Sequence, residues 1–455
     1  MAPKFGTSGL RGLVTELSDA LVARHTAAFL ATCDHGGRVW LGEDLRPSSP
    51  AIAQVIAATA SAQGVAVIRA GALPTPALAH AAAQDGAGAI MVTGSHIPAD
   101  RNGIKFYTRA GEITKSEEEA ISAALETSLS QESAPITEDA EAGARFVARY
   151  VTAFGAAALR GLKLGVYTHS AVGRDLLMEV LSALGAKVTE FGSSATFIPV
   201  DTEAVEPEAR ARFTGWAAGL DALVSTDGDS DRPMVTDATG RVIPGDILGQ
   251  ITARYLGAET IVTPISSNSS VTERGFEAVH LTRIGSPFVI AGMEAATGRV
   301  AGYEANGGFL LGFEAAAPGP LPALMTRDSF LPIIAPLAMA RAAGQPLATL
   351  AAQETLRHTA ADRLTEMPMA ASQALLGQLR DESSARARLL SAAGLGAEAS
   401  CDETDGLRMT DAAGAVLHLR PSGNAPELRL YVEARSPAQA EDVLTAAKRA
   451  VADRL

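Results

Sequence analysis

Short apolar segments alternate along most of the chain with longer segments in which Ala and Leu recur at helical spacing. Parallel strands covered by helices on both faces are apolar throughout, so this alternation predicts an α/β fold with crossover helices. In the first third of the chain, strands are expected at residues 38–42, 65–70 and 87–93. Helices are expected to begin near Ser48 and Pro76, and a third should cover residues 116–127.

A segment rich in Ser, Pro, Glu and Thr, residues 131–143, predicts a connector that ends this first series. Two similar series follow. Their strands are expected at residues 162–168, 187–191 and 221–225, and then at 260–263, 278–282 and 300–303. The repetition indicates three consecutive α/β units of about one hundred residues each, within the usual size of a domain.

The last segment has a different pattern. Residues 407–410, 416–420 and 427–433 are typical of antiparallel strands, and Ser436 is expected to cap a final helix that ends near Arg454. The predicted fold class is therefore α/β, with three topologically similar α/β domains followed by a smaller C-terminal α+β domain. The expected domains are 1–145, 146–255, 256–365 and 366–455.

The composition indicates a folded protein and excludes some partners. The net charge of −13 has the wrong sign for broad binding to nucleic acid or to anionic membranes. The only two cysteines, Cys33 and Cys401, leave no disulfide framework. The N-terminus lacks the apolar region of a signal peptide, and no apolar stretch has the length of a membrane span. We therefore expect a cytoplasmic protein with no nucleic acid partner and no membrane association.

Three aspartates, Asp227, Asp229 and Asp231, directly follow a predicted strand. Ligands of open α/β sheets bind at the carboxyl ends of strands. Carboxylates this close repel one another, and a hard cation such as Mg²⁺ or Ca²⁺ relieves the repulsion. A calcium EF-hand is excluded because Arg232 and Ala238 stand where that loop needs Gly and Glu. The alternative is a solvated acidic turn.

A second polar segment, residues 93–105, also follows a predicted strand. Ser95 offers a hydroxyl, His96 an imidazole, and Arg101 and Lys105 two cations. A serine on a small-residue turn can act as a nucleophile, and nearby cations can stabilise a phosphoryl group in transfer. The alternative is an ordinary turn in which His96 caps the strand.

Two further loops offer groups for a phosphorylated sugar. One lies between two strands of the last domain and can cradle a phosphate, because arginine matches phosphate geometry with two hydrogen bonds. Its residues are Arg420, Ser422, Gly423 and Asn424. The other follows the strand at 300–303 and offers Glu304 and Asn306 to sugar hydroxyls. Each loop is also compatible with plain turn chemistry.

In their order along the chain, these segments resemble the α-D-phosphohexomutases. The resemblance covers essentially the whole chain and rests on seven segments. They are residues 5–12 (Phe-Gly-Thr-Ser-Gly-Leu-Arg-Gly), residues 42–49 (Gly-Glu-Asp-Leu-Arg-Pro-Ser-Ser), the Pro-Thr-Pro at 74–76, the Ser95 segment, the three aspartates, the Glu304 loop and the Arg420 loop.

The resemblance implies four domains around a central active-site cleft, in which Ser95 carries a phosphoryl group. Mg²⁺ would bind to the phosphoserine and to Asp227, Asp229 and Asp231. The remaining catalytic residues would be Arg11, His96, Lys105 and Arg232. The expected partners are hexose phosphates and a hexose 1,6-bisphosphate, which forms when Ser95 passes its phosphate to a hexose phosphate. The Arg420 loop would hold the phosphate that is not reacting, and the chain is expected to be a monomer or a homodimer.

Two positions depart from the family pattern. Gly308 stands where the sugar loop usually has a histidine, and Ser286 takes the place of a second one. Lys105 or His96 is therefore expected to transfer the proton. Mannose phosphate is the first expected substrate, with glucose and glucosamine phosphates as alternatives. A sugar-phosphate-binding regulator without turnover and a metal-dependent phosphatase are the alternatives from other classes.

Overall fold

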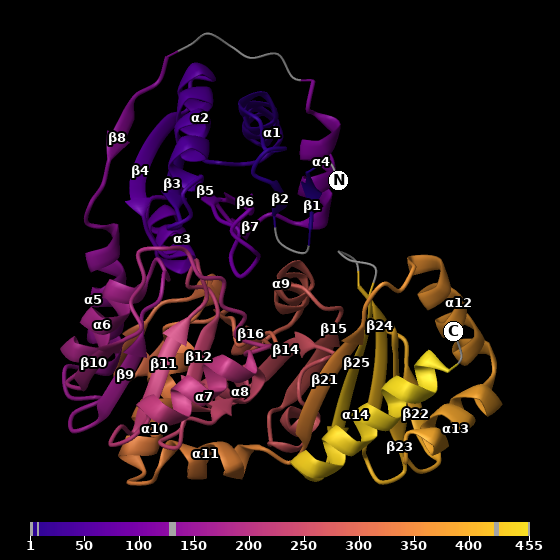
Figure 1. The fold of residues 1–455 in the computed structure, drawn as a ribbon. Helices are drawn as coiled ribbons and strands as arrows, with labels where there is room; N and C mark the ends of the chain where they lie inside the picture. The colour runs from indigo at the N-terminus through magenta and orange to yellow at the C-terminus, as the bar shows by residue number, and fades with distance from the viewer. Residues whose placement is uncertain (1–2, 7–8, 127–132, 423–426, 454–455) are drawn as a thin grey trace. The chain divides into compact units, whose positions relative to one another are not determined.

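The computed structural model of the chain describes residues 3–6, 9–126, 133–422 and 427–453 (Figure 1). The backbone packs into two compact units. The first contains residues 1–261 and 285–351, and the second contains residues 262–284 and 352–455. Within the described ranges, no helix combines the length and the apolar character needed to cross a membrane.

The first sheet of the first unit has the order β1-β2-β6-β5-β3-β4-β8, with β7 on β6. Its strands are β1 (Lys4–Phe5), β2 (Leu10–Leu13), β3 (Arg38–Glu43), β4 (Ala66–Ala72), β5 (Gly88–Val92), β6 (Arg101–Thr108), β7 (Gly111–Glu112) and β8 (Ile136–Glu138). The helices are α1 (Asp19–Thr32), α2 (Ser49–Ala62), α3 (Thr75–Gln84) and α4 (Lys115–Ala123). Val39 and Leu41 of β3 pack into a core with α1 and α2. Gly42 faces the other way, toward Leu78 of α3, because side chains alternate along a strand.

The strands predicted in this region, β3, β4 and β5, are confirmed, but β1, β2, β6, β7 and β8 were missed. The connector predicted at residues 131–143 was wrong, because β8 lies within it and pairs in parallel with β4. All three residues of β8 are exposed, so the strand has no apolar signal. β6, which the sequence analysis also missed, runs antiparallel between β2 and β5. The helix predicted at 116–127 ends at Ala123, and residue 127 lies outside the described residues.

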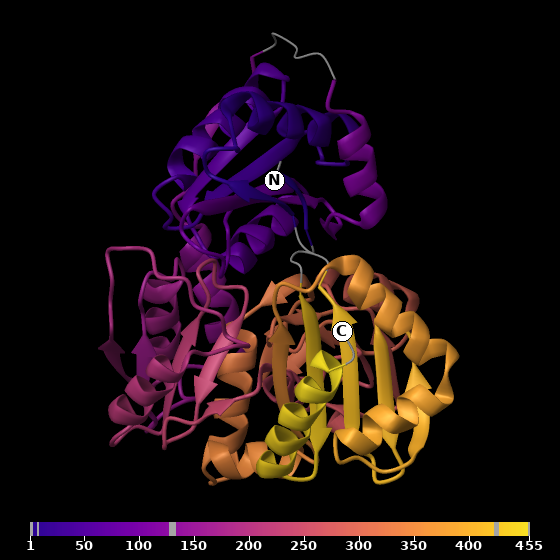
Figure 2. The same cartoon turned by 45° about the vertical axis from the view of Figure 1, so that its right-hand side comes forward.

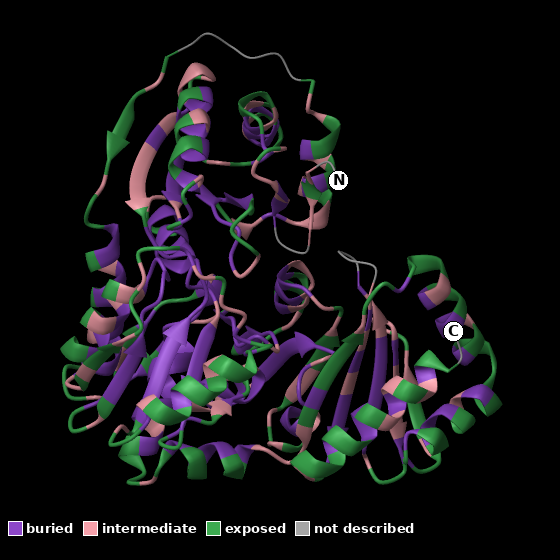
Figure 3. Cartoon of the chain, viewed as in Figure 1, coloured by how far each residue is buried: buried purple, intermediate pink, exposed green. Residues whose placement is uncertain are grey.

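The second sheet has the order β10-β9-β11-β12-β13. Its strands are β9 (Lys163–Tyr167), β10 (Lys187–Phe191), β11 (Ala222–Thr226), β12 (Pro233–Thr236) and β13 (Val242–Ile243), and its helices are α5 (Ala142–Phe154), α6 (Arg174–Ala183), α7 (Pro207–Trp216) and α8 (Gly245–Tyr255). β11 is parallel to β9 but antiparallel to β12, so the chain reverses between them. Both β11 and β12 are buried along their whole length (Figure 3). The loop at this reversal carries the three aspartates.

The third sheet has the order β15-β14-β16-β17-β20, and the division between the two units passes through β14. Its strands are β14 (Thr260–Pro264), β15 (Ala278–Thr282), β16 (Val300–Tyr303), β17 (Phe309–Leu311) and β20 (Leu324–Asp328), and a separate hairpin joins β18 (Ala315–Ala317) to β19 (Gly319–Leu321). The helices are a 3₁₀ turn (Ser269–Glu273), α9 (Ser286–Ala295), α10 (Leu331–Ala342) and α11 (Leu347–Glu354). The hairpin of β16 and β17 holds the Glu304 loop.

The second unit is built on an antiparallel sheet in the order β21-β25-β24-β23-β22. Its strands are β21 (His358–Leu364), β22 (Glu398–Asp402), β23 (Leu407–Asp411), β24 (Val416–Pro421) and β25 (Leu428–Ala434). The helices are α12 (Met369–Asp381), α13 (Ser383–Ala392) and α14 (Pro437–Ala452). Figure 2 shows α14 along one face of this sheet, where Val443, Ala447 and Val451 enter the core. The predicted α/β fold with a C-terminal antiparallel sheet is confirmed.

Candidate active site

Ser95 lies in the loop that joins β5 to β6, with its backbone in the left-handed region at φ 53°. This conformation is unfavourable for a residue with a side chain and persists only where neighbouring contacts enforce it. Here the Ser95 amide donates to Thr93 Oγ1 at 2.8 Å. The left-handed turn holds the serine hydroxyl away from its own strand.

Arg46 determines the shape of the same loop. Its side chain is fully buried and pairs with Asp44 at 3.2 Å. The guanidinium donates to four backbone carbonyl oxygens of the loop, those of Ser95 (2.9 Å), Ile97 (2.6 Å), Pro98 (2.7 Å) and Arg101 (2.8 Å). The sequence showed the Arg46 segment as part of a family resemblance but gave no sign of this role, because the partners are backbone atoms about fifty positions away.

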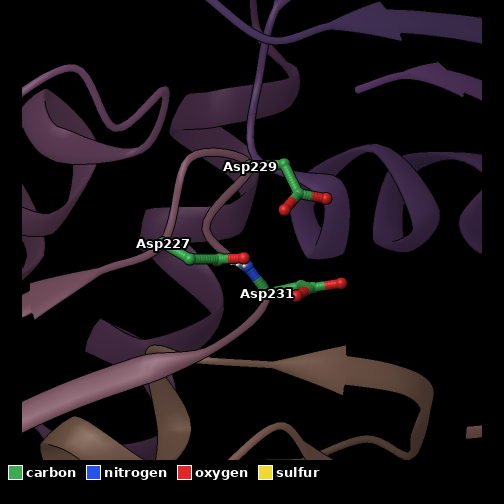
Figure 4. A group of neighbouring side chains, drawn as sticks. All are labelled: Asp227, Asp229 and Asp231. Carbon is green, nitrogen blue, oxygen red and sulfur yellow. Dashed lines mark hydrogen bonds between the residues drawn. The ribbon is translucent and has the colours of Figure 1, made fainter. Parts of the chain in front are cut away.

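The three aspartates extend from the loop between β11 and β12 toward a common space (Figure 4). The Asp231 amide donates to Asp227 Oδ1 at 3.1 Å. Ser230, between the second and third aspartates, is also left-handed, at φ 58°. Its hydroxyl lies 2.8 Å from Thr226 Oγ1 and accepts from the Gly173 amide at 3.0 Å. The loop is therefore fixed by polar contacts of Ser230 and of the Asp231 amide.

The structure brings Ser95, Lys105 and the aspartates into one buried cluster. Ser95 Oγ donates to Asp227 Oδ2 at 2.5 Å. Lys105 Nζ lies 2.6 Å from both Asp229 Oδ2 and Asp231 Oδ2. These pairs join residues more than one hundred positions apart in the sequence, so only the fold brings them together.

Burial and mutual repulsion shape the protonation of this cluster. Burial and the neighbouring aspartates raise the pKa of Asp227 well above its ordinary value. Burial also opposes ionisation of Asp229, but Lys105 and a hydrogen bond from Thr75 outweigh it and lower the pKa of that carboxyl. Burial would lower the pKa of Lys105, yet Asp229 and Asp231 raise it overall. Opposite charges therefore keep Lys105 a cation.

The donor set fits a divalent cation. One carboxylate oxygen from each aspartate lies within 4.8 Å of the others. Lys105 binds the Oδ2 atoms of Asp229 and Asp231, whereas their buried Oδ1 atoms accept no hydrogen bond within the described part of the chain. Buried carboxylate oxygens without a donor are costly unless a cation binds them. Oxygen ligands of this kind suit Mg²⁺.

Three further predicted residues lie around the cluster. His96 Nδ1 lies 3.3 Å from Ser95 Oγ and 3.0 Å from a guanidinium nitrogen of Arg232. The positive charge of Arg232, together with burial, lowers the pKa of His96 to about 2. Burial, Arg232 and Arg327 lower the pKa of Arg11 to about 10. His96 is thus a neutral group between the serine and a cation.

Glu304 and Asn306 lie in the tight turn between β16 and β17. Asn306 Oδ1 accepts from the Gly308 amide at 3.0 Å, so this atom shapes the turn. Glu304 Oε2 accepts from Arg327 at 3.3 Å, and Arg327 also pairs with Asp231 at 2.8 Å. Arg327 was missed at the sequence level, because a single arginine in β20 carries no motif.

The predicted phosphate loop belongs to the second unit. Arg420, in β24, pairs with Asp405 at 3.0 Å. The Ser422 amide donates to Glu427 O at 2.8 Å, which closes the base of the loop. Gly423 and Asn424 lie outside the described residues.

Three stretches of the chain match families of known proteins. Residues 2–132 match the phosphoglucomutase/phosphomannomutase α/β/α domain I, residues 244–357 match its α/β/α domain III, and residues 363–450 match its C-terminal domain. The chain is 45% identical to a phosphomannomutase of Sinorhizobium fredii, over 98% of each chain. It is 40% identical to a phosphomannomutase of Salmonella muenchen, over 97% of this chain and 94% of that one.

Solved structures show the same fold. A putative phosphomannomutase from Thermus thermophilus superposes with a TM-score of 0.79 over 99% of each chain, at 21% identity. An N-acetylphosphoglucosamine mutase of Aspergillus fumigatus, crystallised with GlcNAc-6P and magnesium, superposes with a TM-score of 0.58 at 15% identity, over 100% of this chain and 96% of that one. At these identities the likeness concerns the fold alone.

Proposed function

This chain belongs to the phosphoglucomutase/phosphomannomutase family of phosphohexomutases, and from that premise we propose that it interconverts mannose 1-phosphate and mannose 6-phosphate through a phosphorylated Ser95. The observation that carries the proposal is the contact between Ser95 Oγ and Asp227 in a buried group of three carboxylates. A serine hydroxyl held there can carry a phosphoryl group beside a divalent cation.

The proposed reaction consists of two phosphoryl transfers. In the first, the bond between Ser95 Oγ and phosphorus breaks, and a new bond forms between that phosphorus and a free hydroxyl of the hexose phosphate. That hydroxyl loses its proton, and the freed Ser95 Oγ gains one. The product is a hexose 1,6-bisphosphate. In the second, Ser95 Oγ loses its proton and bonds to the phosphorus of the phosphoryl group originally on the sugar, the bond between that phosphorus and the sugar oxygen breaks, and the sugar oxygen gains a proton. The net result is the isomeric hexose phosphate.

The residues of the cluster supply position and charge in these steps. A bound Mg²⁺, held by Ser95, Asp227, Asp229 and Asp231, would neutralise charge on the phosphoryl oxygens. Lys105 holds two of the aspartates and is a cation at the site of transfer. Arg11 and Arg232 add positive charge on the side of His96. Such preorganised charge accelerates phosphoryl transfer because the transition state is largely dissociative.

Proton transfer is assigned to His96 or Lys105. Of the two, His96 has the direct contact with Ser95 Oγ.

The proposed contacts for sugar hydroxyls are Glu304 and Asn306. The second phosphate is proposed to bind to Arg420, Ser422, Gly423 and Asn424. We also propose that the chain forms the four domains 1–145, 146–255, 256–365 and 366–455, and that it is cytoplasmic. Mannose is favoured because the relatives with 40% identity or more are phosphomannomutases.

The decisive experiment is a mutase assay with Mg²⁺ and a catalytic amount of hexose 1,6-bisphosphate. Mannose, glucose and glucosamine 1-phosphates are assayed side by side, and phosphorylation of Ser95 is read by mass spectrometry. We expect mannose phosphate to turn over fastest and Ser95→Ala to abolish turnover. A Ser95→Ala protein with full activity would contradict the proposal.

Other outcomes would support the other candidates. Faster turnover of glucosamine phosphate would change the assigned substrate. Release of free phosphate in proportion to the substrate consumed would indicate a phosphatase, in which water replaces the sugar hydroxyl. Tight binding of hexose phosphates without isomerisation would indicate a regulator.

A further inference from the structure

Arg327, in β20, contacts both the aspartate loop and the sugar loop of the proposed site. One guanidinium nitrogen pairs with Asp231 of the aspartate loop at 2.8 Å, and the other lies 3.3 Å from Glu304 of the sugar loop. The side chain is 3% exposed. The donors of an arginine lie in a rigid planar fork and can fix the relative geometry of two carboxylates, whereas a lysine ammonium is a point charge on a flexible stem.

The stem of Arg327 fills the space beside Gly308. A Cβ atom at position 308 would lie 2.8 Å from Arg327 Cδ, 2.9 Å from Cγ and 3.2 Å from Cβ. The first two distances are too short for any side chain to be accepted without movement of the arginine. Gly308 does not have a positive φ, so its backbone would accept an alanine. Glycine is therefore required at 308 by the neighbouring arginine and not by the turn.

The second position that departs from the family pattern leads to the same arginine. The Ser286 hydroxyl donates to Glu112 Oε2 at 2.8 Å. Glu112 Oε1 in turn accepts from Thr326 at 3.3 Å and lies 3.9 Å from Arg327 Nε. Both departures, Gly308 and Ser286, thus adjoin a single network in which Arg327 is the cation.

We propose that Arg327 is a positioning residue of this enzyme, which fixes Glu304 for the sugar and Asp231 for the metal in one arrangement. Gly308 complements Arg327, because the lack of a side chain at position 308 leaves space for the arginine stem. The ion pair between Arg327 and Glu304 then orders the sugar loop. This inference rests on the proposed function, because it assigns Glu304 to the sugar.

The first test replaces Arg327 by Lys, which keeps the charge, and by Met, which keeps only the stem. Both variants should bind mannose 1-phosphate at least about tenfold more weakly, since Lys lacks the planar fork and Met offers no donor to Asp231 or Glu304. Binding is measured by calorimetry in a Ser95→Ala background, so the result does not depend on turnover. Arg149→Met is the matched control, because Arg149 is also buried but donates to a backbone carbonyl, Pro322 O, at 2.6 Å.

The second test is a double-mutant cycle between positions 308 and 327, read as kcat/KM of the mutase reaction. Gly308→Ala should lower kcat/KM about tenfold when Arg327 is present and less than twofold in an Arg327→Ala background, because the two contacts under 3.0 Å, with Cγ and Cδ, are then absent. Thermal unfolding of each variant checks that it is folded.

Three results would overturn the inference. They are Arg327→Lys binding within twofold of the Ser95→Ala parent, equal losses in Arg149→Met, or additive effects in the cycle. If the unmodified protein lacks mutase activity altogether, the proposed function fails. The binding measurement then still decides whether Arg327 orders the site.

Discussion

Arg46 shows how one side chain can define an active-site loop. Its guanidinium replaces the backbone partners that a regular strand would give to residues 95–101, and Asp44 balances its charge. Ser49 and Thr93 complete the shell around Asp44, at 2.6 and 2.8 Å. Since every member is buried, loss of the arginine would leave both a carboxylate and several carbonyl oxygens without donors.

We therefore expect Arg46→Met to lower the free energy of unfolding by about 3 to 5 kcal/mol, the usual cost of breaking a buried ion pair. Mutase activity should also be lost, since the left-handed Ser95 turn loses its support. Urea denaturation and the mutase assay measure the two effects. Arg38→Met is the control, because Arg38 pairs with Asp85 at the surface and should cost no more than about 1 kcal/mol. Equal losses in the two variants would contradict this role.

The chain reversal between β11 and β12 places a polar loop at the end of a buried strand. β11 is fixed on one side by parallel pairing with β9 and on the other by antiparallel pairing with β12. The loop therefore begins and ends on fixed backbone. A site built on such rigid strands holds its ligands more closely in place than a site on a long free loop.

Helix α14 is an element whose start the sequence identified correctly. Ser436 accepts from the Gln439 amide at 3.2 Å and satisfies one of the free amides at the helix N-terminus. Ser436→Ala should therefore lower the free energy of unfolding by about 1 kcal/mol. Thermal unfolding measures the loss, and Ser436→Asp, which keeps a capping oxygen, should retain most of the stability. A loss in the Asp variant as large as in the Ala variant would show that the cap contributes nothing.

Across the whole molecule, buried histidines link stability to pH. Burial, with some help from neighbouring arginines, lowers the pKa of His80, His169 and His418 from 6.5 to about 4. As the pH falls from 6.5 to 4, the unfolded chain gains protons that the folded chain does not bind. The free energy of unfolding therefore falls over this window, and each histidine accounts for up to about 2 kcal/mol of the fall by pH 5.

His418→Gln isolates one of these contributions. Between pH 7 and pH 5, the variant should lose about 2 kcal/mol less stability than wild type, because its side chain at 418 does not titrate. Urea denaturation at the two pH values gives the difference. An identical loss in the two proteins would show that His418 does not contribute.

The fold class could be predicted from the sequence, because apolar runs and helical spacing are local patterns. Apolar runs separated by helical segments predicted twelve of the 25 strands in the described residues, including Lys187–Phe191 and Val300–Tyr303 to the residue. Local capping chemistry identified Ser436 as a helix cap. The sequence failed for β8, whose exposed residues have no pattern, and it did not reveal β6. It also identified Ser95, Lys105 and the three aspartates as candidates, because the two polar segments that contain them each follow a predicted strand.

Which of these candidates contact one another depends on how distant segments pack. The contacts of Ser95 with Asp227 and of Lys105 with Asp229 join residues 132 and 124 positions apart, and no local pattern encodes a pairing over such distances. Arg46 and Arg327 became visible in the same way, because their partners are backbone oxygens and carboxylates from distant segments. The departures at Gly308 and Ser286 were apparent in the sequence, but their proximity to Arg327 results from the packing of distant segments.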